Sequence, residues 1–165
     1  MALRQIRREG DELLNKKSKP VKEITPSVLS LMDDMLETLR ELNGLGLAAP
    51  QVGVLKRIIV IENEDELFEV INPEIVETDG TQTSNEACLS IPGLCGDVER
   101  PFKVVVKGLD RFGKEVTFQA DDMMASAFSH EIDHLNGVLF IADAKNVKPL
   151  DREELERRKK KATKK

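Results

Sequence analysis

Both histidines of the chain lie in one short run, His130-Glu131-Ile132-Asp133-His134. In an α-helix, residues four apart lie on the same face, with Cβ atoms about 5–6 Å apart. Two imidazoles at this spacing can bind one metal ion, and a carboxylate follows the first histidine directly. The run therefore predicts a metal-binding helix. Taken alone, it is also compatible with ordinary surface or core histidines.

A metal held by two histidines needs at least one more protein ligand, and the chain has no third histidine. One metalloprotease pattern continues to another histidine; here Gly137 fits that pattern, but Phe140 occupies the ligand position. Thermolysin-like enzymes use a downstream glutamate, which would have to be Glu153 or Glu154 in a tail with almost no apolar face. The third candidate is the thiolate of Cys88.

Two helices are expected to hold this site. The histidine run falls in a helix over residues 121–136, with Gly137 ending it. A second helix spans residues 26–42, where Thr25 can cap the N-terminus and Pro26 suits the first position. Apolar residues recur there at helical spacing, and acidic residues lie off the apolar stripe.

Short strands dominate the middle of the chain. The segments that favour strands are 57–61, 68–72, 75–78, 103–107 and 116–118. Pro73 separates two of them, and a turn at 110–113 makes a hairpin of the last two. Strands and helices do not alternate, so the pattern predicts an α+β fold in which antiparallel β-sheets pack around a central metal-binding helix.

Composition indicates one globular domain with a distinct tail. The 165 residues are 40% hydrophobic and 33% charged, and no apolar run approaches the ~20 residues of a membrane span. No secretion signal is evident, so we expect a cytoplasmic protein whose two cysteines, Cys88 and Cys95, are reduced. Residues 151–165 carry eight basic and four acidic side chains, on a body with net negative charge. Such a basic tail favours the binding of RNA; alternatively, it only keeps the end of a helix soluble.

Three segments together resemble the peptide deformylase family. Gly44 to Gln51, Glu86 to Ser90 and His130 to His134 resemble that family's signatures Gly-x-Gly-x-Ala-Ala-x-Gln, Glu-Gly-Cys-Leu-Ser and His-Glu-x-Asp-His, in the same order and with similar spacing. The likeness covers residues 1–150 as a catalytic domain and leaves 151–165 as a basic tail, expected to be helical. It implies a metal-dependent hydrolase that removes the formyl group from the N-terminal methionine of new proteins.

The resemblance also implies a role for each motif residue. Cys88, His130 and His134 match the metal ligands, and Glu131 matches the general acid/base. Gln51 matches a donor to the oxyanion, with the backbone N–H of Leu89 beside it. Two imidazoles and a thiolate leave a fourth position open to water, as in catalytic centres. The implied cofactor is one divalent ion, usually Fe²⁺, with nickel, cobalt or zinc able to substitute.

By the same likeness, the substrate peptide lies along Gly44-Leu45-Gly46 like an added strand. The methionine side chain enters a pocket whose matching positions are Leu45, Met123, Ser126, Ala127 and His130, with Glu86 and Arg100 near its edge. Two residues depart from the family pattern. Ala87 replaces a glycine, at a cost on the order of 1 kcal/mol if the backbone there has φ > 0. Ser129 replaces a common glutamine.

Two other functions stay open at this point. One is a His-Glu-x-x-His metallopeptidase, and the other is an inactive relative that binds peptides or ribosomes. The implied partners are N-formylmethionyl nascent peptides, with ribosome contact through the tail at 151–165, and neither DNA nor membrane is expected to bind.

Overall fold

The computed structural model describes residues 2–163, without the side chains of 152, 155, 159 and 161–163. The strands are β1 (Gly46–Ala48), β2 (Ile58–Glu62), β3 (Leu67–Cys88), β4 (Ile91–Leu109), β5 (Glu115–Asp121) and β6 (Lys145–Pro149). The α-helices are α1 (Pro26–Glu41), α2 (Asp122–Leu135) and α3 (Arg152–Thr163), and 3-10 turns are η1 (Glu12–Asn15), η2 (Ala49–Val52) and η3 (Phe140–Ala142). None of the helices described combines the length and apolarity that a bilayer crossing requires.

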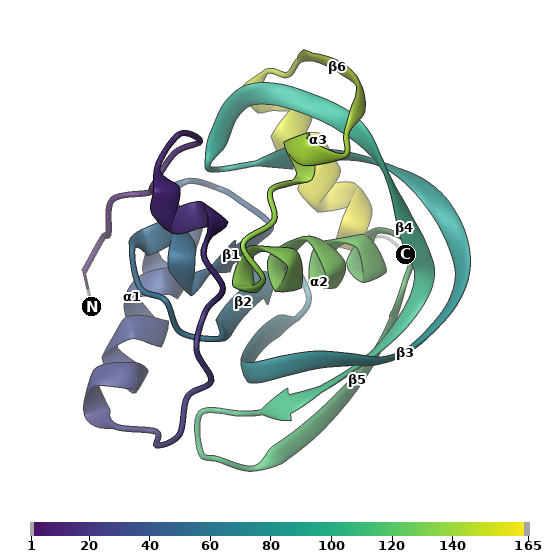
Figure 1. Ribbon diagram of the computed structural model, residues 1–165. Helices are drawn as coiled ribbons and strands as arrows, with labels where there is room; N and C mark the ends of the chain where they lie inside the picture. The colour runs from purple at the N-terminus through teal and green to yellow at the C-terminus, as the bar shows by residue number, and fades with distance from the viewer. Residues whose placement is uncertain (1, 164–165) are drawn as a thin grey trace.

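The named strands form one antiparallel sheet in the order β1-β2-β3-β4-β5, with β6 paired to β4. Figure 1 shows the long strands β3 and β4 curving around α2, which lies near the centre of the molecule. The expected α+β fold with antiparallel strands around the histidine helix is confirmed. The sheet is single and strongly curved, so that one continuous surface encloses α2.

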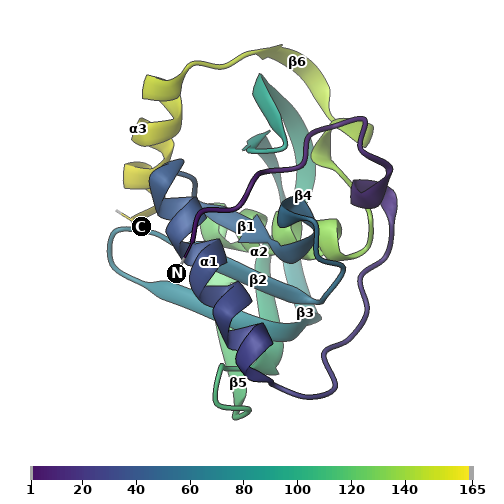
Figure 2. The same cartoon turned by 90° about the vertical axis from the view of Figure 1, so that its left-hand side faces the viewer.

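The strand β2 lies between α1 and α2 and packs against both helices. Its first four residues are all fully buried, because α1 covers one face of the strand and α2 the other (Figure 2). Ile58 and Val60 belong to the cluster under α1, while Ile59 and Ile61 belong to the cluster under α2. Side chains alternate between the faces of a strand, so this continuous apolar run joins two cores.

The helix α1 begins as the sequence predicts. The Thr25 hydroxyl accepts a hydrogen bond from the Val28 N–H at 3.2 Å, and Pro26 occupies the first turn. The acidic residue Asp34, expected off the buried stripe, is nevertheless buried, because the N-terminal segment lies over it. Its carboxylate accepts hydrogen bonds from the Ala2 N–H at 2.7 Å and from Arg4 Nε at 2.9 Å.

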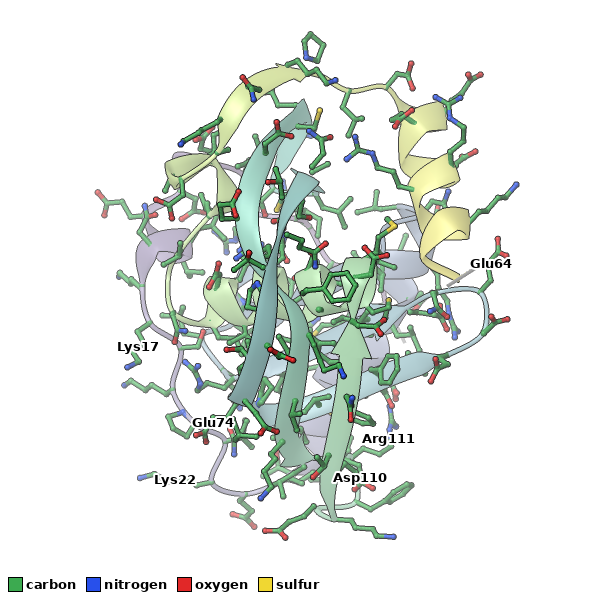
Figure 3. All side chains as sticks on the ribbon, turned by 90° about the vertical axis from the view of Figure 1, so that its right-hand side faces the viewer. Lys17, Lys22, Glu64, Glu74, Asp110 and Arg111 are labelled. Carbon is green, nitrogen blue, oxygen red and sulfur yellow. The ribbon has the colours of Figure 1, made fainter. Side chains whose placement is uncertain are left out.

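The strand β3 is one continuous element of 22 residues, although the sequence suggested two shorter pieces around Pro73. The register between β3 and β4 shifts between Ile71 and Glu74, so the proline falls within a bulge, where its missing N–H is tolerated. At the β4–β5 turn, as predicted, the chain reverses at 110–113, where Figure 3 labels Asp110 and Arg111. The Arg111 guanidinium pairs with Glu69 and Asp33.

Candidate metal centre

The predicted helix boundaries are confirmed at α2. It runs from Asp122 to Leu135, and Gly137 follows with φ +77°, a conformation that glycine adopts without strain. His130 and His134 therefore lie one turn apart on the face that β3 and β4 enclose. Their rings are 5.0 Å apart between centroids, and both are buried.

The third donor comes from the far end of β3. Cys88 is the last residue of that strand, and a two-residue turn at Leu89-Ser90 leads into β4. The Cys88 Sγ lies 3.3 Å from His134 Nε2, and one donor atom from each of Cys88, His130 and His134 lies within 4.8 Å of the others. The pair Cys88 and Cys95 forms no disulfide, and Cys95 is a buried hydrophobe, as expected.

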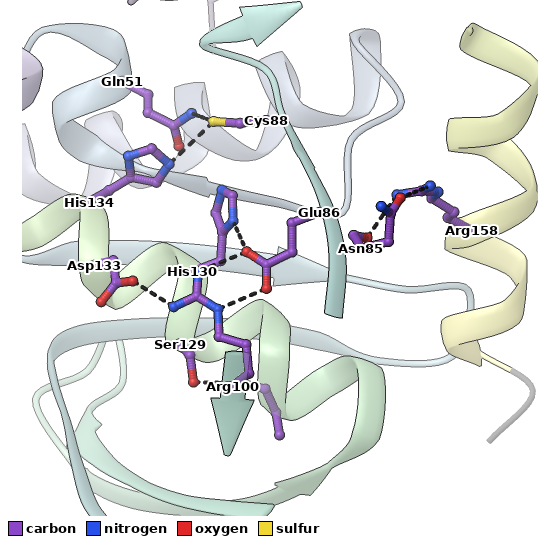
Figure 4. Close-up of polar contacts among 11 residues, drawn as sticks. Gln51, Asn85, Glu86, Cys88, Arg100, Ser129, His130, Asp133, His134 and Arg158 are labelled. Carbon is purple, nitrogen blue, oxygen red and sulfur yellow. Dashed lines mark hydrogen bonds and ion pairs between the residues drawn. The ribbon is translucent and has the colours of Figure 1, made fainter. Parts of the chain in front are cut away.

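A chain of ionic contacts fixes the ring of His130 (Figure 4). Its Nδ1 contacts Glu86 Oε1 at 2.9 Å, and both oxygens of Glu86 accept hydrogen bonds from Arg100, at 2.8 and 2.7 Å. Arg100 Nη1 also donates to Asp133 at 2.6 Å. Because Nδ1 is engaged, Nε2 of His130 is the nitrogen available for a metal.

Burial and charge set the pKa values of these groups. Burial would raise the pKa of Glu86, but hydrogen bonds from Arg100 and His130 lower it to about 2. Burial likewise lowers the pKa of His130, yet contacts with Cys88 and Glu86 raise it well above its usual range. The pKa of His134 lies well below its usual value because burial and the neighbouring positive charges disfavour protonation. Glu86 is therefore a permanent anion beside His130.

Gln51 directs its amide group toward Cys88. Its Oε1 accepts a hydrogen bond from the Ala48 N–H at 2.9 Å, which fixes the orientation of the amide. Its Nε2 donates to Ser90 Oγ at 3.0 Å. The same Nε2 lies 3.4 Å from Cys88 Sγ (Figure 4). The side chain is 1% exposed. A buried amide held in this way presents an N–H at the ligand cluster without further rearrangement.

Glu131 lies over the backbone of Gly46. A Cβ placed on that glycine would lie 2.7 Å from Glu131 Oε2, closer than side chains tolerate. The other oxygen, Oε1, is buried and has no hydrogen-bond partner in the described part of the protein. Burial, with the nearby carboxylates of Glu86 and Asp133, raises the pKa of Glu131 to about 7 against the opposing charges of His130 and Arg100. The backbone at Gly46 is thus closely approached by a side chain of α2.

The donor set fits a divalent metal ion. Two imidazole nitrogens and one thiolate suit zinc, iron, cobalt or nickel. Glu131 follows His130 directly, and its Oε1 is buried with no partner among the described residues; a polar group held by the ion would complete its hydrogen bonding. Nδ1 of His134 is also buried, with no hydrogen-bond partner among the residues that the structure describes. Among those residues, only His130 has its outer nitrogen oriented by a protein group.

A cavity of about 1070 Å³ opens onto two of these donors, Cys88 and His130. Most of the predicted site residues line it, namely Gly44, Leu45, Gly46, Gln51, Glu86, Cys88, Leu89, Met123, Ser126, Ala127, His130 and Glu131. Arg100 and His134 are not among the lining residues. Arg100 lies behind Glu86, so its contact with the cavity passes through that carboxylate. This place differs from the edge of the substrate pocket that the family resemblance implies for Arg100.

The alternative third ligands lie elsewhere. Phe140 stacks on His130 with 5.9 Å between ring centroids, so it supports the imidazole instead of replacing a histidine. Glu154 lies on α3 and pairs with Arg157 and Arg158. Cys88 is therefore the ligand that the fold brings to the two histidines.

Comparison with known proteins agrees with this geometry. Residues 3–150 match the family model described as polypeptide deformylase. The chain belongs to the polypeptide deformylase family. A peptide deformylase of Acetivibrio thermocellus is 52% identical over 159 residues, covering 96% of this chain and 92% of that protein. The peptide deformylase of Halothermothrix orenii is 57% identical over 143 residues, covering 86% and 93%.

Solved structures of deformylases share the fold. A crystal structure of a peptide deformylase from Legionella pneumophila superposes with a TM-score of 0.84 at 40% identity, covering 99% of this chain and 96% of that one. The Thermotoga maritima peptide deformylase gives a TM-score of 0.85 at 38% identity, covering 88% and 99%.

Neither departure from the deformylase motif strains the site. Ala87 has no positive φ; it lies in β3 opposite Cys95, so the expected backbone cost does not arise. The Ser129 hydroxyl donates to the Ala125 carbonyl at 2.9 Å within α2. The hydroxyl is therefore hydrogen-bonded within α2 itself.

Sequence reasoning missed the support behind the ligands. It placed Glu86 and Arg100 near the substrate and gave no role to Asp133 or Ser90. The signal for Asp133 was its place on α2, three residues after His130. Nothing local marks Arg100, because β3 and β4 bring it to Glu86 across a strand pair.

Proposed function

We propose that this chain hydrolyses the N-formyl group from the N-terminal methionine of newly made proteins and releases formate. The convergence of Cys88 Sγ with His130 and His134 beneath one cavity carries the proposal. These three residues would hold one divalent ion. When bound, the ion acts as a Lewis acid that activates water and polarises the formyl oxygen. Family likeness favours Fe²⁺ as the native ion.

Glu131 is the proposed general acid and base. Its unpartnered Oε1 is free to accept a proton from the attacking water, and the same carboxyl can then protonate the departing amine. Because Oε2 packs on Gly46, the carboxylate cannot swing toward that strand. Its position beside His130 and the cavity suits both proton transfers.

Negative charge develops on the formyl oxygen as water adds to its carbon. We infer that the Gln51 amide N–H and the Leu89 backbone N–H donate hydrogen bonds to that oxygen. Ala48 and Ser90 already orient the Gln51 amide, so only the N–H now directed at Cys88 Sγ has to turn to the formyl oxygen. Loss of one such donor typically lowers the rate about 10²–10³-fold.

The peptide would add to the sheet as an extra strand. β1 stands at one end of the strand order, so one of its edges is unpaired among the named strands. Residues Gly44 to Gly46 also line the cavity, as do Ala87 and Leu89. Main-chain hydrogen bonds along this edge would hold peptides of varied sequence, with the first side chain entering toward Met123 and Ala127.

The test compares Glu131→Ala with the unaltered chain. The variant is expected to keep about one metal ion per chain and to lose release of formate from formyl-Met-Ala-Ser by several orders of magnitude. Casein cleavage, measured alongside, reports endopeptidase activity, which we expect to be absent from both proteins. Appreciable formate release by the variant would remove Glu131 from the mechanism.

Residues 1–150 form the proposed catalytic domain, and 151–165 a basic tail that meets ribosomal RNA in the cytoplasm. Because Arg158 bonds to the Asn85 carbonyl at 2.8 Å and lines the cavity, deleting the tail would also alter the cavity wall. The cleaner variant replaces the five lysines at 159–161, 164 and 165 with glutamine. It should co-sediment less with ribosomes at low salt, since phosphate contacts depend strongly on salt. Unchanged sedimentation would end this part of the proposal.

A further inference from the structure

The helix α2 carries two buried serines, and only one of their hydroxyl groups has a hydrogen-bond partner among the described residues. Ser126 and Ser129 are each 5% exposed. The Ser129 hydroxyl is bonded to the Ala125 carbonyl, whereas the Ser126 hydroxyl has no hydrogen-bond partner in the described part of the protein. A buried hydroxyl without a partner is unfavourable, and such groups are uncommon in folded proteins.

Ser126 also lies where a substrate side chain would meet it. It lines the cavity one helical turn, about 5.4 Å, before His130. The neighbouring lining side chains, Leu45, Met123 and Ala127, are apolar. Ser126 is therefore a polar residue among apolar neighbours of the cavity wall, beside the metal ligands. Its hydroxyl oxygen is buried, and a χ1 rotation that turned it toward the cavity would break no hydrogen bond among the described residues.

If formylated peptides bind as proposed above, this wall receives the first side chain. The sulfur of methionine is three bonds from its α-carbon, and a thioether is only a weak acceptor. Oxidation gives methionine sulfoxide, which is polar, chiral at sulfur and carries an oxygen that accepts hydrogen bonds well. An apolar pocket would reject that oxygen, but a pocket with an unused hydroxyl can pair with it.

We propose that Ser126 donates a hydrogen bond to this oxygen and that the enzyme also deformylates chains beginning with N-formylmethionine sulfoxide. The reaction at the formyl group is unchanged. Water adds to the formyl carbon and gives a proton to Glu131, the C–N bond breaks, formate leaves, and Glu131 passes the proton to the departing amine nitrogen. The S–O bond is neither made nor broken, so no oxidant or reductant takes part. The inference rests on the proposed function.

The experiment uses the metal-loaded full chain and three peptides, in which formyl-Met, formyl-Met sulfoxide or formyl-norleucine precedes Ala-Ser. Norleucine has nearly the shape of methionine but offers no acceptor. The unaltered protein is expected to cleave the sulfoxide peptide with a kcat/KM at least equal to that for norleucine. In Ser126→Ala this ratio should fall about tenfold, because the hydrogen bond is lost. Ser129→Ala is the matched control and should keep the original ratio.

Two further readouts separate recognition from a structural effect. A hydroxyl fixed on one side of the pocket should favour one sulfoxide epimer, and Ser126→Ala should abolish that preference. Without peptide, the Tm of Ser126→Ala should equal or exceed that of the unaltered protein, since the hydroxyl has no partner to lose. A lower Tm, or a substrate ratio unchanged within twofold, would overturn the inference.

Failure of this inference is distinct from failure of the proposed function. Cleavage of formyl-Met-Ala-Ser without any Ser126-dependent preference would refute the role of the hydroxyl alone. Lack of formate release from formyl-Met-Ala-Ser would refute the deformylase proposal itself, and the inference with it.

Discussion

Replacing Gly46 with alanine tests whether Glu131 must occupy its present position. Gly46 is not in a positive-φ conformation, so its backbone accepts alanine. The new Cβ, however, would lie 2.7 Å from Glu131 Oε2 and 3.0 Å from its Cγ and Cδ. Restoring an ordinary contact of 3.4 Å moves the carboxylate by about 0.7 Å.

A displacement of that size has a definite consequence for catalysis. Misplacement by 1 Å can cost about 10²-fold in rate, so we expect kcat/KM for formyl-Met-Ala-Ser to fall about 10–100-fold in Gly46→Ala. Metal content should not change, because none of the three ligands is touched. Gly10→Ala provides the control. Its φ is +101° and no atom lies within 4 Å of the added Cβ, so it should lose about 1–2 kcal/mol of stability without loss of activity.

A double-mutant cycle isolates the contact. In the Glu131→Ala background the added Cβ meets no carboxylate, so Gly46→Ala should destabilise the chain less there than in the unaltered protein. Urea unfolding of the metal-free proteins measures both differences. Equal costs in the two backgrounds, or full activity of Gly46→Ala, would refute the assignment of Glu131 to this position.

Three further predictions concern the supports of the site and the fold. Arg100→Met should cost about 3–5 kcal/mol in urea unfolding, because Glu86 stays buried without its guanidinium, and should weaken metal binding about 10–100-fold in competition titrations. Arg111→Met, which also breaks two carboxylate contacts, should leave metal affinity unchanged. Burial raises the pKa of Asp34, but hydrogen bonds from Ala2 and Arg4 outweigh it and lower the pKa below 3.8. The stability that this carboxylate contributes is therefore present above pH 3.8 and lost as the pH falls through its lowered pKa. The difference in unfolding free energy between the unaltered chain and Asp34→Asn should shrink over that range, and a constant difference would contradict the assignment. Removing the metal with a chelator should lower Tm, and adding it back at about 100 times its Kd should restore about 2.7 kcal/mol.

Local rules in the sequence determined the elements that carry the ligands. The spacing of His130 and His134 fixes them on one helical face wherever that helix lies, and Thr25-Pro26 and Gly137 mark helix ends through backbone geometry alone. Cys88 could be named as the third ligand because an ordered set of motifs, together with Phe140 at the competing position, left it as the best candidate. The sequence also predicted the strand β2, because a run of apolar β-branched residues favours an extended backbone.

Only the tertiary structure decided what surrounds those ligands. The pairing of β3 with β4 brings Arg100 to Glu86, and their packing on α2 brings both to His130; no local pattern encodes such a register. The approach of Glu131 to Gly46 and the hydrogen bond from Gln51 to Ser90 are likewise contacts between segments distant in the chain. Packing around α2 also decides that the Ser126 hydroxyl has no partner among the described residues. Helix periodicity and helix capping follow from hydrogen bonds between residues that are close in the chain. The orientation of the side chains around the ligands, and the polar atoms left without partners, depend on how distant buried surfaces pack together.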